Sequence, residues 1–148
     1  MNRPISTRTH GVIDYTWASI SAAVPNMMND GAATARLIRG ASAAATTNSM
    51  LTNYEGGVMK VMPMKAHLAM DFVMCSALLL SPFFLPSSER RYAAIPMLLG
   101  GAGLLTALMT ETESPTEQSL SFTPSRELSE AVADPDIART PHLRAHLE

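Results

Sequence analysis

Two histidine–aspartate pairs are the residues in this sequence best suited to chemistry. His10 is followed four residues later by Asp14, and His67 is followed in the same way by Asp71. A spacing of four places each pair on one face of a helix, one turn apart. Imidazole and carboxylate groups in such pairs bind transition metals, orient a ligated histidine or pass protons.

Both pairs belong to a longer stretch that the chain contains twice. Arg8–Pro25 is matched at one constant interval by Lys65–Pro82, and the histidine, aspartate, one serine and the proline are identical in the two copies. We interpret this match as an internal duplication, with repeat 1 over about residues 4–55 and repeat 2 over about residues 61–110.

Four apolar stretches predict an all-α fold, a bundle of four transmembrane helices over residues 1–110. Each stretch approaches the ~20 residues that cross a hydrocarbon core of ~30 Å. The short connections predict two tandem antiparallel hairpins. The prolines of the repeat fall late in the first and third helices, where they are expected to kink or end the helix. We expect the helices at about residues 10–28, 31–52, 66–85 and 92–110.

The second of these helices is the least apolar, because it contains two arginines and a centre of Gly, Ala, Ser and Thr. Small residues let helix backbones approach each other in a bilayer, so this composition fits a helix packed inside a bundle. A soluble four-helix bundle is the alternative. We expect close helix packing at Gly40, Ala44, Gly100, Gly101 and Gly103.

Each repeat is expected to cross the membrane twice, so both copies begin on the same side and His10 and His67 lie at equal depth. The connector between the repeats, residues 53–64, contains Tyr54, which is expected at the membrane interface. Basic residues are balanced between the two sides. We expect a multi-pass protein of a bacterial cytoplasmic membrane with both termini in the cytoplasm.

A carboxylate inside an apolar helix costs about 2.5–3.5 kcal/mol at mid-helix, which something must offset. A structural explanation is local, with each aspartate accepting from its own histidine or lying near Arg8 or Lys65. Three functional explanations compete with it: a metal site of two histidines and two carboxylates, a histidine ligand to haem or chlorin, and a proton relay. The relay would include Glu55, Glu111 and Glu113. The cofactor, if any, stays open.

Residues 111–148 have a different composition, rich in Ser, Thr, Pro, Glu and Arg. Such a segment does not bury enough apolar surface to fold alone, so it is expected to be disordered or bound to a partner. A short helix capped by Ser125 is expected over residues 126–133. His142 and His146, also four apart, are an exposed pair with little functional weight.

Several function classes lack their motifs here. The net charge of -2 gives no attraction to nucleic acid, and Cys75 is the only cysteine. The sequence contains no nucleotide-binding loop and no Ser/His/Asp set. We therefore expect no enzyme.

Short segments of both repeats resemble the SPW-repeat-type small integral membrane proteins of bacteria. They are Ile5–Gly11, Tyr54-Glu55-Gly56 and Pro63-Met64, together with the histidine–aspartate pairs. The family's Ser-Pro-Trp signature appears here as Ser81-Pro82-Phe83. The resemblance covers roughly residues 4–110 and implies two hairpins of two membrane helices, with almost no indication of function.

From these features we predict a non-catalytic accessory or scaffold subunit of a larger membrane complex, such as a bioenergetic one. Its partners would be the lipid bilayer and other membrane subunits, with the C-terminal tail as a latch. The alternative is a metal-, haem- or chlorin-binding redox protein, or a proton- or ion-handling one, that uses the four repeated histidine and aspartate side chains.

Overall fold

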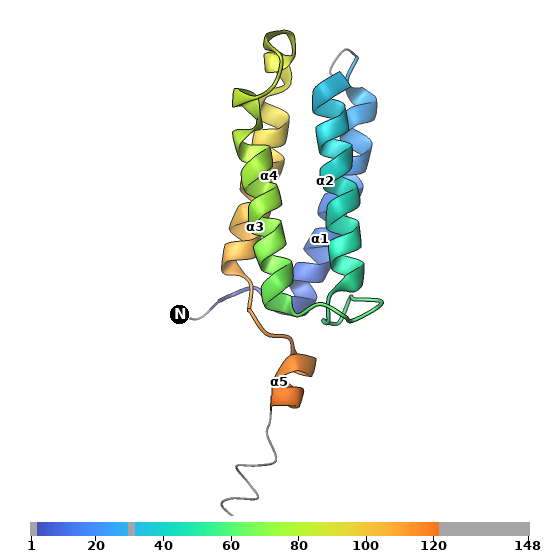
Figure 1. Ribbon diagram of the computed structural model, residues 1–148, viewed down its shortest axis with the longest axis vertical. Helices are drawn as coiled ribbons and strands as arrows, with labels where there is room; N and C mark the ends of the chain where they lie inside the picture. The colour runs from blue at the N-terminus through green and yellow to red at the C-terminus, as the bar shows by residue number, and fades with distance from the viewer. Residues whose placement is uncertain (1–2, 30–31, 122–148) are drawn as a thin grey trace, which may run out of the picture. The chain divides into compact units, whose positions relative to one another are not determined.

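The computed structural model describes residues 3–29 and 32–121, and every regular element within them is helical. This confirms the all-α prediction. Residues up to Glu117 form one compact unit, and the chain from Gln118 onward belongs to a second unit. The helices, seen in Figure 1, are α1 (Thr7–Ala23), α2 (Ala32–Leu51), α3 (Met64–Leu80), α4 (Ala94–Met109) and the short α5 (Pro115–Ser121).

Capping and proline residues set the ends of α1 and α3. Ser6 is the N-cap of α1, and its hydroxyl accepts a hydrogen bond from the Thr9 amide at 3.2 Å. Pro25 lies in a 3-10 turn that follows α1 directly, and Pro82 lies in the equivalent turn after α3. Proline lacks an amide proton and clashes with the preceding helical turn, so both α-helices end there as predicted. The expected ends at residues 28 and 85 were too late for this reason.

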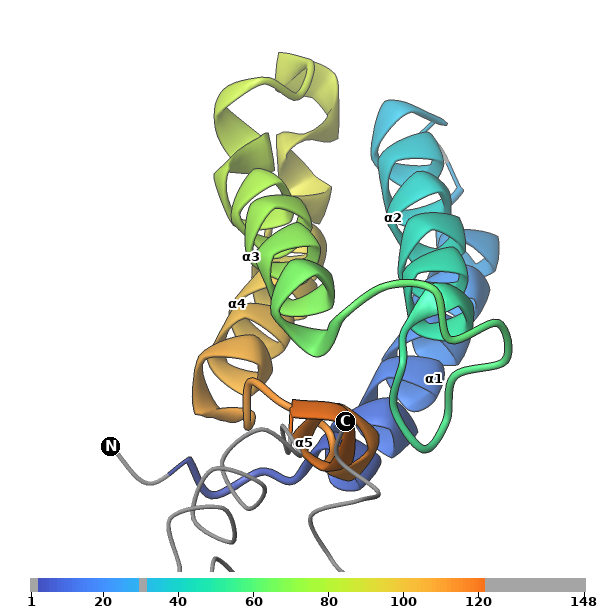
Figure 2. The ribbon, with the colours of Figure 1, turned by 60° about the horizontal axis from the view of Figure 1, so that its bottom comes forward.

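The four long helices pack as two hairpins, α1 with α2 and α3 with α4 (Figures 1 and 2). Gly100 brings α4 against α3, because a β-carbon there would lie 2.5 Å from the Cys75 carbonyl oxygen. Gly103 likewise faces the Cys75 sulfur. A β-carbon at Gly40 or at Gly101 would have no atom of the surrounding structure within 4 Å. Two of the expected packing glycines therefore pack inside the chain, and two face open space, as does the exposed Ala44.

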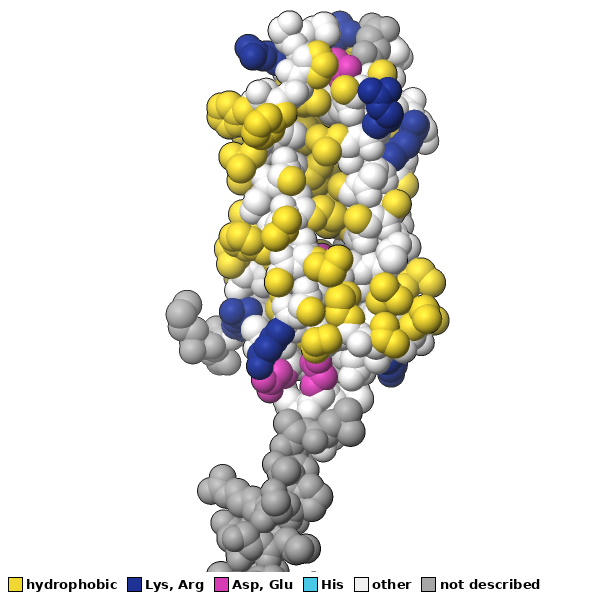
Figure 3. All heavy atoms as spheres, in the orientation of Figure 1, with side chains coloured by type: hydrophobic (Ala, Val, Ile, Leu, Met, Phe, Trp, Pro, Cys, Tyr) yellow, Lys and Arg dark blue, Asp and Glu magenta, His cyan; other side chains and the backbone are white. Residues whose placement is uncertain are grey.

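Polar side chains fill much of the interior of these helices, and large apolar side chains cover much of the outside. Among the described residues, fourteen buried residues are polar or charged and ten are hydrophobic. Val12, Val73 and Leu98 are 65%, 68% and 73% exposed. On the face drawn in Figure 3, Lys and Arg side chains lie toward the ends of the helices and hydrophobic side chains lie between them.

One segment of the described chain, Met64–Phe83, is long and apolar enough to cross a membrane. Helix α4 is apolar but shorter. The prediction of a membrane helix is thus supported for one of the four helices. Membrane crossing stays a prediction for all four helices.

The connector between the hairpins folds back against the ends of the helices. Thr52 and Met62 form an isolated parallel bridge, and Ile5 forms a second such bridge with Thr110. Tyr54 lies fully buried, at 0% exposure, so its side chain faces the interior and is not the outward-facing interface anchor that was predicted. It is held against α1 because residue 11 is glycine and leaves room for the ring.

The chain after α4 forms the short helix α5, which begins before the helix that the sequence predicted over residues 126–133. The Ser114 hydroxyl accepts from the Glu117 amide at 3.3 Å, and the Glu117 carboxylate accepts from the Ser114 amide at 2.8 Å. This reciprocal capping box starts α5. The other Glu117 oxygen accepts from the Met64 amide at 2.9 Å, which joins this turn to the start of α3. The expected helix at 126–133 and the pair His142 and His146 lie outside the described residues.

Candidate metal centre

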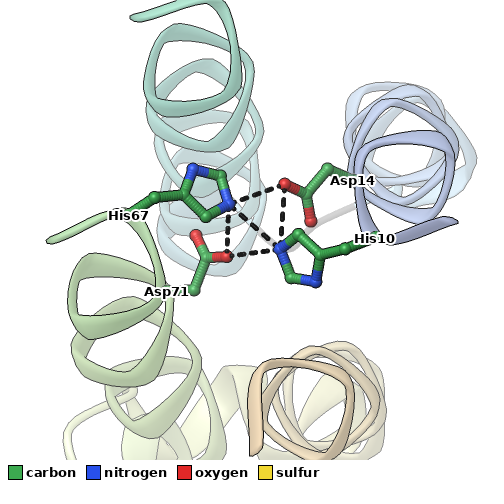
Figure 4. Close-up of side chains that lie close together, drawn as sticks. All are labelled: His10, Asp14, His67 and Asp71. Carbon is green, nitrogen blue, oxygen red and sulfur yellow. Dashed lines mark hydrogen bonds and ion pairs between the residues drawn. The ribbon is translucent and has the colours of Figure 1, made fainter. Parts of the chain in front are cut away.

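His10 and Asp14 from α1 meet His67 and Asp71 from α3 in the interior, as Figure 4 shows. The Nε2 atoms of the two histidines lie 3.0 Å apart. The Nε2 atom of His10 lies 3.3 Å from one carboxylate oxygen of each aspartate. The Nε2 atom of His67 lies 2.9 Å and 3.0 Å from the same two oxygens. The four side chains that the sequence singled out therefore form one cluster.

The cluster is largely buried, and no Lys or Arg side chain of the described residues forms an ion pair with it. The histidine side chains are 1% and 0% exposed, and those of Asp14 and Asp71 are 13% and 7% exposed. The charges expected to support the aspartates lie elsewhere. Lys65 forms an ion pair with Glu113, Glu55 accepts a hydrogen bond from Thr7, and Arg8 is exposed.

A threonine at the end of α2 fixes the proton position on His67. The Thr52 hydroxyl donates its only proton to the Asn48 carbonyl oxygen at 2.6 Å, and its oxygen lies 2.8 Å from Nδ1 of His67. Because that proton is already used, the hydroxyl oxygen acts as an acceptor, and Nδ1 of His67 is the donor. The neutral His67 ring therefore keeps a free electron pair on Nε2.

His10 has the same arrangement with a threonine at the end of α4. The Thr110 hydroxyl donates to the Thr106 carbonyl oxygen at 2.7 Å, and its oxygen lies 2.8 Å from Nδ1 of His10. Nδ1 of His10 is therefore also a donor, and its Nε2 also carries a free electron pair when the ring is neutral. Each threonine belongs to the hairpin that does not carry its histidine.

Two residues of α2 orient the carboxylates. Ser49 donates to the Asp14 oxygen that faces the histidines, at 2.9 Å. Asn48 donates to the outer oxygen of Asp71 at 2.9 Å and to the His67 carbonyl oxygen at 3.2 Å. With the threonines, these contacts place hydrogen-bonding partners behind all four side chains, as is usual around metal ligands.

The cluster therefore points two imidazole electron pairs and two carboxylate oxygens at one point. With neutral rings it carries two negative charges and repels itself, unless a cation or two protons lie between the four groups. Five of the six separations between these donor atoms are 2.9–3.3 Å, and all lie within 4.8 Å. Ligands at about 2.0 Å from a tetrahedral zinc ion would be about 3.3 Å apart. The spacing thus fits a first-row transition-metal ion.

The sequence reasoning missed Asn48, Ser49, Thr52 and Thr110. A signal for the two threonines was available, because they lie almost one repeat interval apart at the ends of the second helix of each repeat. Their role depends on which helix ends meet in space, and spacing alone does not supply that.

Comparisons of the chain with protein-family models, with curated proteins and with solved structures found no match. The resemblance to SPW-repeat-type proteins accordingly stays a prediction.

Proposed function

We propose that this chain is a multi-pass membrane protein whose two helical hairpins bind one divalent transition-metal ion between them. The observation that carries the proposal is the convergence of His10, Asp14, His67 and Asp71 with both Nδ1 protons committed to threonines. The two hairpins would be the products of an internal duplication, which supplies one histidine and one aspartate from each.

The distribution of polarity supports the membrane part of the proposal. A soluble protein rarely exposes large contiguous apolar surface, whereas exposed apolar side chains are favourable in lipid. Here Val12, Val73 and Leu98 face outward while serines, threonines and the metal centre are inside. Helix α2, with 20 residues, is about 30 Å long at 1.5 Å per residue, which matches a hydrocarbon core. We place the protein in a bacterial cytoplasmic membrane with both termini in the cytoplasm.

The donor set indicates the class of ion. Two imidazole nitrogens and two carboxylate oxygens suit zinc, iron(II) or manganese(II), and lack the thiolates that favour copper(I). A haem or chlorin ring fits less well. The Nε2 atom that would bind its metal already faces the other histidine at 3.0 Å, which leaves no room for a macrocycle between them.

Protons are the competing occupants of the centre. Two imidazolium rings would neutralise the two carboxylates as one divalent ion does, which would make the cluster structural or part of a proton relay. Metal content separates these cases.

The test is metal analysis of the untagged protein, purified in detergent after growth with zinc, iron and manganese supplied. A His142→Gln/His146→Gln background removes the histidine pair of the tail. We expect about one ion per chain, and loss of that ion in His67→Gln and in Asp71→Asn. Ser19→Ala is the matched control, since this exposed serine on α1 only donates to the Tyr15 carbonyl. A folded, metal-free protein would contradict the proposal.

An accessory role in a larger complex is a second candidate. The observation that favours it is the open space around Gly40 and Gly101, where a partner helix could approach closely. The proposed latch is the tail over residues 111–148, and the part of it beyond residue 121 lies outside the described residues. Co-purification from native membranes, with Gly40→Leu as the disrupting variant, tests this role without reference to metal.

A further inference from the structure

A cavity of about 20 Å³ lies directly beside the four-residue centre, between α1, α2, α3 and α4. Asp14 and Asp71 both line it, whereas neither histidine does. The rest of its wall includes Trp17, Ala45 and Thr106. About 10–15 Å³ is enough for one water molecule when polar partners are present. The cavity therefore has the size and position to hold one water on the carboxylate side of the centre.

The wall of the cavity offers acceptors to a water molecule, but its only free donor is the weak one of the Cys75 thiol. The carboxylates of Asp14 and Asp71 can accept both protons of a water molecule. The two strongest potential donors in the wall are already used. The Trp17 indole nitrogen donates to the Leu99 carbonyl oxygen at 3.0 Å, and the Thr106 hydroxyl donates to the Ala102 carbonyl oxygen at 3.0 Å. A water here would have acceptors for its protons but no good donor for its oxygen.

A metal ion in the centre supplies what the water oxygen lacks, because a cation accepts a lone pair where a donor group is missing. We infer that this cavity holds a water molecule that is a fifth ligand of the metal ion, so that the centre has an exchangeable coordination position. This inference rests on the proposed metal binding and adds to it the class of ligand, a small neutral molecule or anion of water's size.

A fifth, exchangeable ligand would make this centre different from a closed structural metal site. Structural zinc sites are closed, with four protein ligands and no water, whereas sites that act on a ligand keep a position for it. The one exchangeable position faces a buried space between the helices, so access to the metal is limited to molecules of about the size of water.

The test uses cobalt(II) loaded into the purified apoprotein in detergent, with its visible absorption as the readout. Four-coordinate cobalt(II) absorbs several-fold more strongly than five-coordinate cobalt(II). We expect the weaker, five-coordinate spectrum for the wild-type protein and a spectral shift on adding fluoride, an anion of about the size of water. The wild-type measurement alone can overturn the inference, because a strong four-coordinate spectrum that fluoride leaves unchanged would mean a closed site.

Variants of α2 provide the matched pair. Ala45→Val places two methyl groups in the cavity wall, whereas Ala43→Val adds the same groups at an exposed position on the same helix. We expect Ala45→Val to keep one cobalt ion per chain, to gain the stronger spectrum and to lose the fluoride response, and Ala43→Val to behave as wild type. An unchanged fluoride response in Ala45→Val would place the ligand elsewhere and overturn the inference. Failure of the wild-type protein to bind any metal would instead refute the proposed function.

Discussion

Thr52 and Thr110 each use their only hydroxyl proton on the carbonyl of the residue four positions earlier. Such bonds are common for threonine in helices and by themselves say nothing of function. Here they leave each hydroxyl oxygen as an acceptor for a histidine Nδ1–H, which directs the Nε2 electron pairs of both rings to one point. At the scale of single residues, these two hydroxyls are the feature that most favours the proposed metal binding over a set of buried polar side chains.

The threonine contacts predict the effect of removing each hydroxyl. Thr52→Val and Thr110→Val keep the shape of the side chain but leave Nδ1 of the facing histidine without an acceptor. We expect metal affinity to fall about 10- to 100-fold in each variant, as for other groups that orient a ligand. Competition with a coloured chelator measures this affinity.

Thr47→Val is the control for both, since Thr47 makes the same bond to the carbonyl four residues earlier but is exposed and contacts no histidine. If all three variants bound metal equally, the threonines would have no part in the centre.

At the scale of elements, α1 depends on a glycine for its fit against the connector. A β-carbon at Gly11 would overlap the ring of Tyr54, which is fully buried beside His67 at 5.8 Å between ring centroids. The connector, the start of α1 and the centre therefore form one packed region. A change at one of them moves the others.

Gly11→Ala should destabilise the protein by about 1–3 kcal/mol, because the interior has to shift to accept the added carbon. Denaturant or thermal unfolding in detergent measures this loss. Gly101→Ala in α4 is the control, since it adds a methyl group in open space and should be neutral or up to about 1 kcal/mol stabilising through helix propensity. Equal effects of the two changes would argue against tight packing of Tyr54 on α1.

The positions of the helices and the connector show which features the sequence predicts and which it does not. Apolar runs and prolines predicted the four long helices. The repeated spacing predicted equal depth for His10 and His67, and a site shared by both histidine–aspartate pairs was one of several explanations that it left open. The burial of Tyr54 was missed because the residue lies at a predicted helix end, where an aromatic side chain is expected to anchor at a membrane interface. A connector can also fold inward at a helix end, as it does here. The charges near the centre were misplaced because nearness in sequence did not put Lys65 beside Asp71. It pairs with Glu113 from beyond α4 instead.

At the scale of the whole described unit, two of the polar contacts between the hairpins lie near opposite ends of α2. One is the four-residue centre with its threonines. The other is Glu89, in the turn between α3 and α4, whose carboxylate accepts from the amides of Ala33 and Thr34 and from the Thr34 hydroxyl at 2.8–3.0 Å. These bonds satisfy free amides at the start of α2, where the helix dipole also favours an anion.

The hydrogen bonds accepted by Glu89 predict a pH dependence of stability. The backbone amides of Thr34 and Ala33, followed by the Thr34 hydroxyl, lower the pKa of Glu89 below its ordinary value of 4.5. A lowered folded-state pKa means that the stabilisation is complete above pH 4.5 and is lost as the pH falls through the folded value. We expect Glu89→Gln to melt at a lower temperature than wild type at pH 6, with the difference shrinking below pH 4.5.

The comparison of the two proteins at each pH removes the contribution of other acidic groups, since both chains share them. A difference that stayed constant from pH 6 down to pH 3 would show that the carboxylate charge of Glu89 has no part in holding α2.

Each histidine takes its threonine partner from the other hairpin, and this has a consequence for the order of folding during synthesis. His10 is synthesised before its hydrogen-bond acceptor Thr110, which follows 100 residues later. During that interval the histidine and the aspartate of the first hairpin lack half of their neighbours. The first hairpin is therefore completed only when the second one folds against it, and on the proposed function metal loading would be the last step of assembly.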